Sequence, residues 1–312
     1  MARGASGAYL EAVIAIVHHP DYVAPAPADS RYRWNKNGLV KEHLEASGAA
    51  IAWIEPEAMP RAWLERVHCP DYVDEVITAA VPRDKERRIG FAVTQVVARR
   101  AQRVPGGTYR AALEALERGF AANNAGGSHH GLYDTGAGYC VFNDLAIAAV
   151  RLTVEGRVRR VLVVDCDVHQ GDGTAALCAG REGIATFSIH AEKNFPVRKA
   201  VSTVDVALAD GTGDRDYLQA LEESLVPLLD SFAPELILYQ GGVDPFEGDR
   251  LGRLALTQGG LDARDALVAG LAKARGLPVA ATLGGGYGAD IGEVAARHAR
   301  TMLNVGRLLS RA

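Results

Sequence analysis

The 312-residue sequence lacks the features of several specialised protein classes. It contains no run of about 20 apolar residues, so no membrane-spanning helix is expected. Its formal net charge of -4 gives no sign of a nucleic-acid-binding surface. Basic residues gather between Arg83 and Arg88, but Asp84 and Glu86 interrupt them, and the segment is interpreted as a solvated loop. We therefore expect neither a membrane span nor a nucleic-acid partner.

Cysteine is scarce and shows no paired spacing. The four cysteines are Cys69, Cys140, Cys166 and Cys178, and Cys166 lies inside an apolar run. This usage is typical of reduced thiols in a cytoplasmic protein rather than of a disulfide framework. The apolar run at 13–17 is preceded by Glu11, and no small-residue cleavage site follows it, so a secretory signal is not expected either.

Short aliphatic runs alternate with segments of helical periodicity. Strands are predicted at 13–17, 50–54, 161–165, 184–189, 236–239 and 278–283. Helices are predicted at 39–46, 90–103, 108–122, 143–154, 214–229, 262–274 and 291–309. Nearly continuous apolar strands that alternate with helices indicate a parallel sheet covered by helices on both faces. Because no linker or repeat divides the chain, we predict one α/β domain over residues 1–312.

Polar side chains follow three of these predicted strands. Asp165, Asp167 and His169 come after the run at 161–164, Asp244 follows the run at 236–239, and Tyr287 follows the run at 280–283. The carboxyl ends of parallel strands open at one edge of the sheet, where ligands bind. The sequence therefore predicts that these residues converge from distant positions.

Asp165, Asp167 and His169 alternate along the chain, so in an extended backbone they share one face. Three ionisable groups beside an apolar strand are costly unless they are compensated, and a divalent cation would compensate them. Two aspartates and one histidine, with Asp244 delivered to the same edge, leave coordination positions free, as in catalytic rather than structural zinc sites. The structural alternative is that the carboxylates accept hydrogen bonds from loop amides and that Asp172 caps the next helix.

Two adjacent histidines, His129 and His130, lie in a glycine-rich loop at 126–131. Hydrolysis by a metal-activated water needs a base and an acid nearby, and this pair can supply both. A second pair, His18 and His19, precedes Pro20 and is interpreted as a structural part of a loop at a strand end.

With these motifs in place, the chain resembles the histone deacetylase superfamily, which also contains acetylpolyamine amidohydrolases and acetoin-utilisation proteins. The matching motifs run in family order: Gly-Gly-Ser-His-His at 126–130, Gly-Tyr-Cys-Val-Phe-Asn-Asp at 138–144, Asp-Cys-Asp-Val-His-Gln-Gly-Asp-Gly-Thr at 165–174, Gly-Gly-Val-Asp at 241–244 and Gly-Gly-Gly-Tyr at 284–287. Gln170 and the stretch 244–254 are similar to the class IV branch. The resemblance implies a three-layer α/β/α sandwich with a mostly parallel central sheet, the arginase/deacetylase fold.

The resemblance also implies roles for individual residues. The implied zinc ligands, with Fe²⁺ as the alternative metal, are Asp167, His169 and Asp244. The implied catalytic groups are His130 as general base, His129 as its electrostatic partner, Asp165 and Asp172 as the carboxylates that orient the two rings, and Tyr287 as oxyanion donor. The implied substrate contacts are the Gly138 carbonyl for the amide nitrogen, and Tyr139 and Phe195 for the walls of an acyl-lysine channel. A monovalent cation, K⁺ or Na⁺, is implied near Asp165, Asp167, His169 and Ser188.

These roles together describe a zinc-dependent amidohydrolase that removes acetyl or longer fatty acyl groups from lysine side chains of a peptide or protein. The alternative substrate is an acetylpolyamine or another small acyl-amine. A two-manganese, arginase-type site would need a second Asp-x-Asp pair, whereas the chain reads Asp-Pro-Phe-Glu at 244–247. A non-catalytic acyl-binding relative would lack a ligand, the histidine pair or the tyrosine, and all are present. The sequence leaves the acyl length, the physiological substrate and the oligomeric state open.

Overall fold

Eight parallel strands form one sheet in the computed structural model, which describes residues 13–23 and 32–311. The strands lie in the order β2-β1-β3-β8-β7-β4-β5-β6. Their bounds are β1 Ile14–Val17, β2 Ile51–Ile54, β3 Phe120–Asn123, β4 Val161–Asp165, β5 Ile184–Ala191, β6 Val204–Leu208, β7 Leu236–Gln240 and β8 Val279–Thr282. All register pairs are parallel. The predicted α/β class with a parallel central sheet is confirmed.

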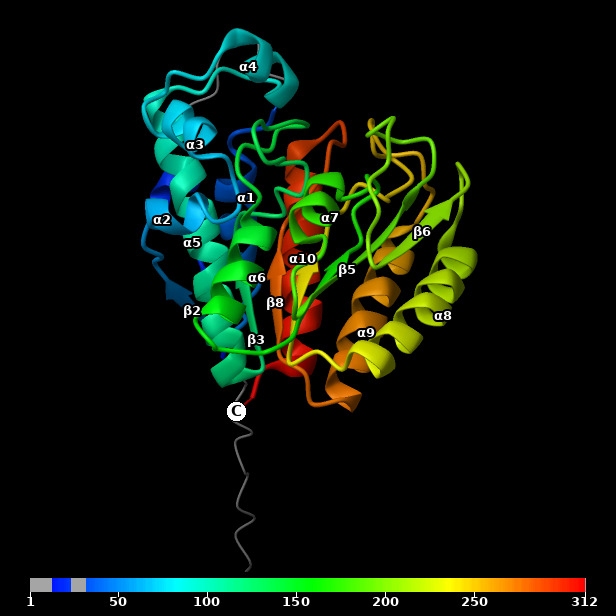
Figure 1. Cartoon of the computed structure of the whole chain (residues 1–312). Coiled ribbons are helices and arrows are strands. Elements are labelled where there is room, and N and C mark those ends of the chain that lie inside the picture. The colour runs from blue at the N-terminus through cyan, green and yellow to red at the C-terminus, as the bar shows by residue number, and fades with distance from the viewer. Residues whose placement is uncertain (1–12, 24–31, 312) are drawn as a thin grey trace, which may run out of the picture.

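Helices cover both faces of this sheet (Figure 1). One face packs against α1 Lys36–Ala46, α8 Asp214–Phe232, α9 Gln258–Ala274 and α10 Ile291–Leu309. The other face packs against α2 Arg61–Leu64, α3 Pro70–Ile77, α5 Gln95–Arg118, α6 Asp144–Val154 and α7 Asp172–Cys178. Successive residues of a strand pack against opposite helix layers. In β4, Leu162 and Val164 pack on the side of α1, α8, α9 and α10, and Val161 and Val163 pack on the other side. Strands buried on both faces explain why their sequences are nearly continuous apolar runs.

Helix α5 corrects the prediction of two helices at 90–103 and 108–122. It runs unbroken through Pro105, although proline removes one backbone hydrogen bond. The next two residues are glycines because other chain segments pass very close: a Cβ at Gly106 would lie 2.0 Å from the Glu57 carbonyl oxygen, and one at Gly107 would lie 2.0 Å from the Tyr22 hydroxyl. Gly119, with φ of 85°, ends the helix, and the chain turns directly into β3.

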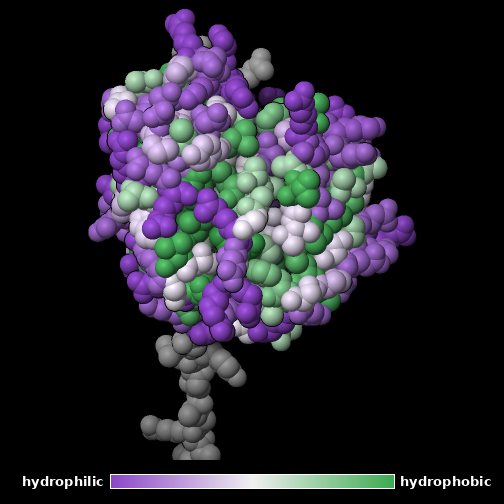
Figure 2. Space-filling model, in the orientation of Figure 1, coloured by the Kyte–Doolittle hydropathy of each residue, from purple (hydrophilic) through white to green (hydrophobic). Residues whose placement is uncertain are grey.

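The basic segment between Arg83 and Arg88 is also not a loop. It forms most of α4 Arg83–Ile89, which ends at Gly90 in the left-handed region. Lys85 pairs with Glu75 at 2.6 Å, which ties α4 to α3. In Figure 2 the top of the molecule, where α4 lies, is mainly hydrophilic, while apolar residues gather lower on the same face.

The sheet order sets the position of the site. The adjacent strands β3, β8, β7 and β4 lead, at their carboxyl ends, into the segments that hold the histidine pair, Tyr287, Asp244 and the Asp165–His169 motif. Residues more than 150 positions apart in the sequence are thereby brought to one edge.

The four cysteines are free, and no helix in the described ranges is long and apolar enough to cross a membrane. The short 3₁₀ helix η1 Pro20–Tyr22 follows β1.

Candidate metal centre and active site

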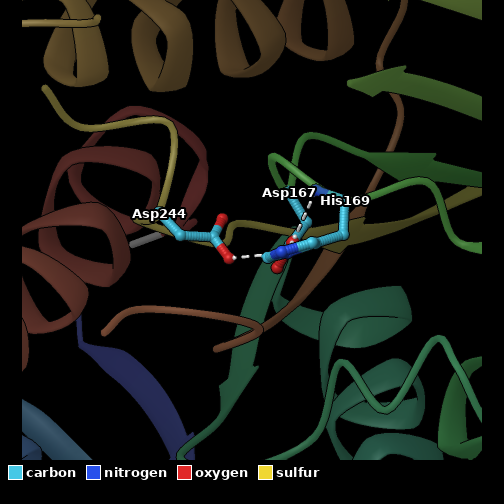
Figure 3. A group of neighbouring side chains, drawn as sticks. All are labelled: Asp167, His169 and Asp244. Carbon is cyan, nitrogen blue, oxygen red and sulfur yellow. Dashed lines mark hydrogen bonds and ion pairs between the residues drawn. The ribbon is translucent and has the colours of Figure 1, made fainter. Parts of the chain in front are cut away.

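Three predicted ligands form a buried cluster beyond the ends of β4 and β7. One ligand atom from each of Asp167, His169 and Asp244 lies within 4.8 Å of the others, and all three residues are buried (Figure 3). The His169 Nδ1 atom lies 3.0 Å from Asp167 Oδ1 and 3.2 Å from Asp244 Oδ2. Asp244 Oδ2 is buried, and its ion pair with His169 is its only contact of this kind in the described ranges. Two carboxylates and an imidazole are a donor set that zinc accepts, and a buried carboxylate oxygen directed at that set fits a metal ligand.

Neighbouring groups fix the two carboxylates. Asp167 Oδ2 accepts hydrogen bonds from Gln240 Nε2 at 2.9 Å and from the Gly285 backbone N–H at 2.7 Å. Asp244 Oδ1 accepts from the Val168 N–H at 2.9 Å. Gln240 was not predicted as a site residue. The sequence feature that could have indicated it is a polar amide side chain directly after the apolar run at 236–239. Such outer contacts orient metal ligands and are often as important as the ligands themselves.

The cluster concentrates opposite charges among buried side chains. Burial would lower the pKa of His169, but hydrogen bonds to Asp167 and Asp244 outweigh it and raise this pKa to about 10. Burial and the adjacent charge of Asp167 raise the pKa of Asp244 to about 7. A divalent cation at the same atoms would displace the imidazole proton and keep both carboxylates ionised. The three side chains therefore suit an ion better than a proton.

The histidine pair lies beside this cluster. His129 Nδ1 is 2.7 Å from Asp165 Oδ2, His130 Nδ1 is 2.6 Å from Asp172 Oδ1, and the two ring centroids are 4.0 Å apart. Burial would lower the pKa of His129, but Asp165 and other carboxylates raise it to about 9. For His130, burial and the neighbouring His129 lower the pKa to about 4. The environments separate the two rings into a cationic and a neutral one.

Hydrogen bonds to a buried carboxylate hold the loop that carries this pair. The backbone N–H groups of Gly127 and Ser128 donate to the buried Asp144 carboxylate at 3.2 and 2.7 Å. Gly126 and Gly127 have φ of 83° and 75°, which non-glycine residues rarely adopt. The glycine-rich sequence is thus required by the turn that directs His129 and His130 toward the metal centre.

A channel of about 320 Å³ leads to the cluster from the surface. Its walls include Gly138, Tyr139, Phe195 and Tyr287. The Phe195 ring lies 4.8 Å from the His130 ring, and the Tyr139 ring lies 5.8 Å from the Tyr287 ring, centroid to centroid. Gly138 must be small, because a Cβ there would lie 2.7 Å from His130 Cδ2. The structure thus brings together all the residues that the sequence singled out as catalytic, substrate-binding or metal-binding.

Other polar residues near the site have structural contacts. Asp249, five residues after Asp244, accepts hydrogen bonds from the backbone N–H groups of Leu251, Gly252 and Tyr287. It therefore forms a turn and also holds the backbone of Tyr287. His19 caps η1 by accepting from the Asp21 N–H, and His18 contacts Asn124.

Comparison with known proteins identifies the family of the chain. The histone deacetylase domain family matches residues 29–303. The chain belongs to the histone deacetylase family. Histone deacetylase 2 of Arabidopsis thaliana is 31% identical over 264 residues, which are 81% of this chain and 68% of the relative. An uncharacterised protein of Picosynechococcus is 42% identical over 285 residues, 91% of this chain and 95% of that protein.

Two further proteins share part of the sequence or the fold. The histone deacetylase-like amidohydrolase of Pseudomonas aeruginosa is 33% identical over 181 residues, 53% of this chain and 48% of that protein. The crystal structure of an acetylpolyamine aminohydrolase from Burkholderia pseudomallei superposes with a TM-score of 0.79 at 22% identity, over 95% of this chain and 99% of the other. The chain is a histone deacetylase-family amidohydrolase with the fold of these enzymes.

Proposed function

We propose that the protein is a metal-dependent deacylase that removes an acetyl or other acyl group from lysine side chains. The observation that carries this proposal is the buried Asp167–His169–Asp244 cluster beside the His129–His130 pair, at the inner end of an aromatic channel. A metal site, a base and a narrow path for an extended side chain are the three parts that hydrolysis of an acyl-lysine needs.

Zn²⁺, or Fe²⁺ as the alternative, would be held by Asp167, His169 and Asp244 and would supply Lewis acidity to the carbonyl and acidify a water. The neutral ring of His130 takes the proton of the attacking water, while Asp172 holds its Nδ1–H. The cationic ring of His129 stabilises negative charge and keeps a proton close to the leaving amine.

Tyr287 and Gly138 position the amide. Burial and the charges of Asp244 and Asp167 raise the pKa of Tyr287 well above its ordinary value, so its hydroxyl stays protonated and can donate to the oxygen that becomes negative. The carbonyl of Gly138, on the channel wall, would accept the N–H of the scissile amide.

The channel entrance favours acyl-lysine over an acetylpolyamine. Its charged lining residues are Lys193 and Arg253, and no aspartate or glutamate lines it among the described residues. Arg253 is partly offset by Asp210 at 2.9 Å, whereas Lys193 has no ion pair within the described ranges. A polyamine brings additional positive charge to this entrance and would be repelled there. Acetylpolyamine hydrolysis is therefore our second candidate, supported by the shared fold.

The test is a comparison of an acetyl-lysine peptide with N-acetylputrescine, using protein reconstituted with Zn²⁺. We expect the peptide to be the better substrate by kcat/KM, and we expect His130→Ala to abolish turnover while the exposed His43→Ala does not. Preference for acetylputrescine would favour the second candidate. Absence of turnover of both compounds by a metal-loaded, folded protein would contradict the deacylase proposal and favour a non-catalytic acyl-binding role.

We also propose a site for K⁺ or Na⁺ near Asp165, Asp167, His169 and Ser188. Ser188 pairs in register with Asp165 across β4 and β5, so its backbone carbonyl lies on the strand beside the metal segment. Activity measured in potassium, sodium and tetramethylammonium salts at constant ionic strength should differ if this cation is bound.

A further inference from the structure

A second, smaller cavity adjoins the channel. Its volume is about 40 Å³, and it shares the residues His129, Gly138, Tyr139 and Tyr287 with the channel. We call it the inner cavity. Because a lysine side chain would fill the channel from the surface, the acyl group on its nitrogen would point past the metal toward the inner cavity. The lining of this cavity therefore bears on which acyl groups fit.

The lining contains a buried lysine. Lys36, at the start of α1, is 6% exposed, and its Nζ donates to the Gly284 carbonyl at 2.8 Å. The N–H of Gly285 in the same peptide group donates to Asp167 Oδ2. One peptide group thus separates this ammonium from a predicted metal ligand. Burial lowers the pKa of Lys36 to about 8, so the ammonium is still mainly protonated at neutral pH.

A second cation and an unsatisfied amide complete the polar lining. Arg100 lies on α5 and donates to the Tyr32 hydroxyl at 2.9 Å and to the Tyr22 carbonyl at 3.2 Å. Asn37 is 1% exposed, and its Oδ1 finds no hydrogen-bond partner in the part of the chain that the structure describes. Within residues 13–23 and 32–311, neither Lys36 nor Arg100 forms an ion pair with a carboxylate.

Burying a cation without a counter-charge is costly. The nearest carboxylates to Lys36 by electrostatic effect are Asp244 and Asp167, and a divalent cation would balance that pair. Once the metal centre is neutral, Lys36 and Arg100 face the inner cavity, and no aspartate or glutamate is among its described lining residues. This environment suits a carboxylate and is unfavourable for a long aliphatic chain.

The size of the cavity agrees with this chemistry. A volume of about 40 Å³ holds roughly three water molecules. A succinyl group exceeds an acetyl group by four heavy atoms, one methylene carbon and one carboxylate, which is a comparable volume. A myristoyl group adds a dozen methylenes and would have to displace the Lys36 side chain.

We propose that the inner cavity is a subsite for short acyl groups that end in a carboxylate, such as succinyl-lysine, with Lys36 and Arg100 as the groups that bind this carboxylate. The proposal rests on the deacylase function proposed above. In the reaction one water is consumed: the C–N bond breaks, the acyl carbon gains the oxygen and becomes a carboxylate, and the nitrogen gains both protons of the water. The products are a free dicarboxylate and the lysine ammonium group.

The experiment compares peptides that carry acetyl-, butyryl- and succinyl-lysine at one position, with the full chain loaded with Zn²⁺. Butyryl-lysine is the matched neutral control, because it has the same four-carbon chain without the charge. We expect kcat/KM for the succinyl peptide to exceed that for the butyryl peptide by about 10-fold or more, which is the scale of a charge-assisted hydrogen bond. Lys36→Met should remove most of this ratio, and Lys36→Arg should retain part of it. Lys41→Met, also on α1 but not part of the cavity lining, should leave the ratio unchanged.

Equal or better hydrolysis of the butyryl peptide by the wild-type protein would overturn the proposal, and so would a ratio that Lys36→Met does not change. Loss of activity on all peptides would instead contradict the deacylase function. In that case, measured binding affinities test whether the inner cavity is a subsite for the carboxylate. The Zn²⁺-loaded Tyr287→Phe variant should bind the succinyl peptide at least about 10-fold more tightly than the butyryl peptide, and equal affinities would refute the subsite.

Discussion

The Nδ1 atom of His130 lies 2.6 Å from Asp172 Oδ1, at the start of α7. This contact leaves the other ring nitrogen free to take a proton, and the Asp172 charge opposes the fall of the His130 pKa. Asp172→Asn keeps the shape but removes the charge. We expect kcat on an acetyl-lysine peptide to fall by about 10–100-fold with little change in KM. The exposed Asp216→Asn is the control; a kcat within twofold of wild type for Asp172→Asn would contradict the orienting role.

Tyr287→Phe removes one hydroxyl from the channel. Because this hydroxyl is expected to donate only as negative charge develops on the carbonyl oxygen, its loss should lower kcat by about 10²–10³-fold and leave KM nearly unchanged. The exposed Tyr133→Phe serves as the matched control. A higher KM with an unaltered kcat would show that the hydroxyl serves ground-state binding instead.

Most of the fold and of the candidate site could be predicted from the sequence, because the residue patterns there coincide with burial and strand order. Runs such as Val161–Asp165 are both β-branched and buried on two faces, so pattern and structure coincide. Residues 291–309 form one amphipathic helix, as predicted. The Asp165, Asp244 and Tyr287 segments converge because adjacent strands place their carboxyl ends together, which follows from the parallel sheet alone.

The errors have physical causes as well. Strand β3 reads Phe-Ala-Ala-Asn, which has little strand signal next to a long helix, and only Gly119 marks the change. The Pro105-Gly106-Gly107 sequence looks like a helix end, but tertiary packing retains the helix through it. Lys36 could not be found in advance, because its contact with Gly284 joins positions 248 residues apart.

A substitution at Gly285 tests the position of the metal site, because this residue lies against two of the predicted ligands. A Cβ at this position would lie 2.0 Å from Asp244 Oδ2 and 2.8 Å from Asp167 Oδ2. Gly285→Ala should therefore displace both carboxylates, and the purified protein should contain less bound metal by elemental analysis. We also expect Zn²⁺ to raise the melting temperature of the wild type but not that of the variant. Gly270→Ala, in α9 with open space around it, should keep full metal content and raise stability by about 0.5–1 kcal/mol. Full metal occupancy in Gly285→Ala would place the ion elsewhere.

The lowered pKa of the buried His68 should make the free energy of unfolding depend on pH, independently of the metal centre. It is fully buried; its Nδ1 lies 2.7 Å from the Leu132 carbonyl oxygen, and its Nε2 accepts the backbone N–H of Asn143, the residue that caps α6. Burial lowers the pKa of His68 to about 4, so the folded protein resists a proton that the unfolded chain binds at about pH 6.5. The contribution of this residue to the free energy of unfolding is complete above about pH 6.5 and decreases as the pH falls toward 4, by up to about 3 kcal/mol.

His68→Gln can keep both hydrogen bonds, since an amide both donates and accepts, but it does not titrate. Urea unfolding of the two proteins at several pH values from 4.5 to 7.5 should show a shallower loss of stability for the variant below pH 6.5, whatever its stability at pH 7.5. His18 and His190, whose pKa values are also lowered to about 4, titrate in both proteins, so their effect cancels in the difference. Parallel curves over the whole range would mean that His68 accepts its proton as readily in the folded state as in the unfolded chain, and that the Asn143 cap does not require a neutral ring.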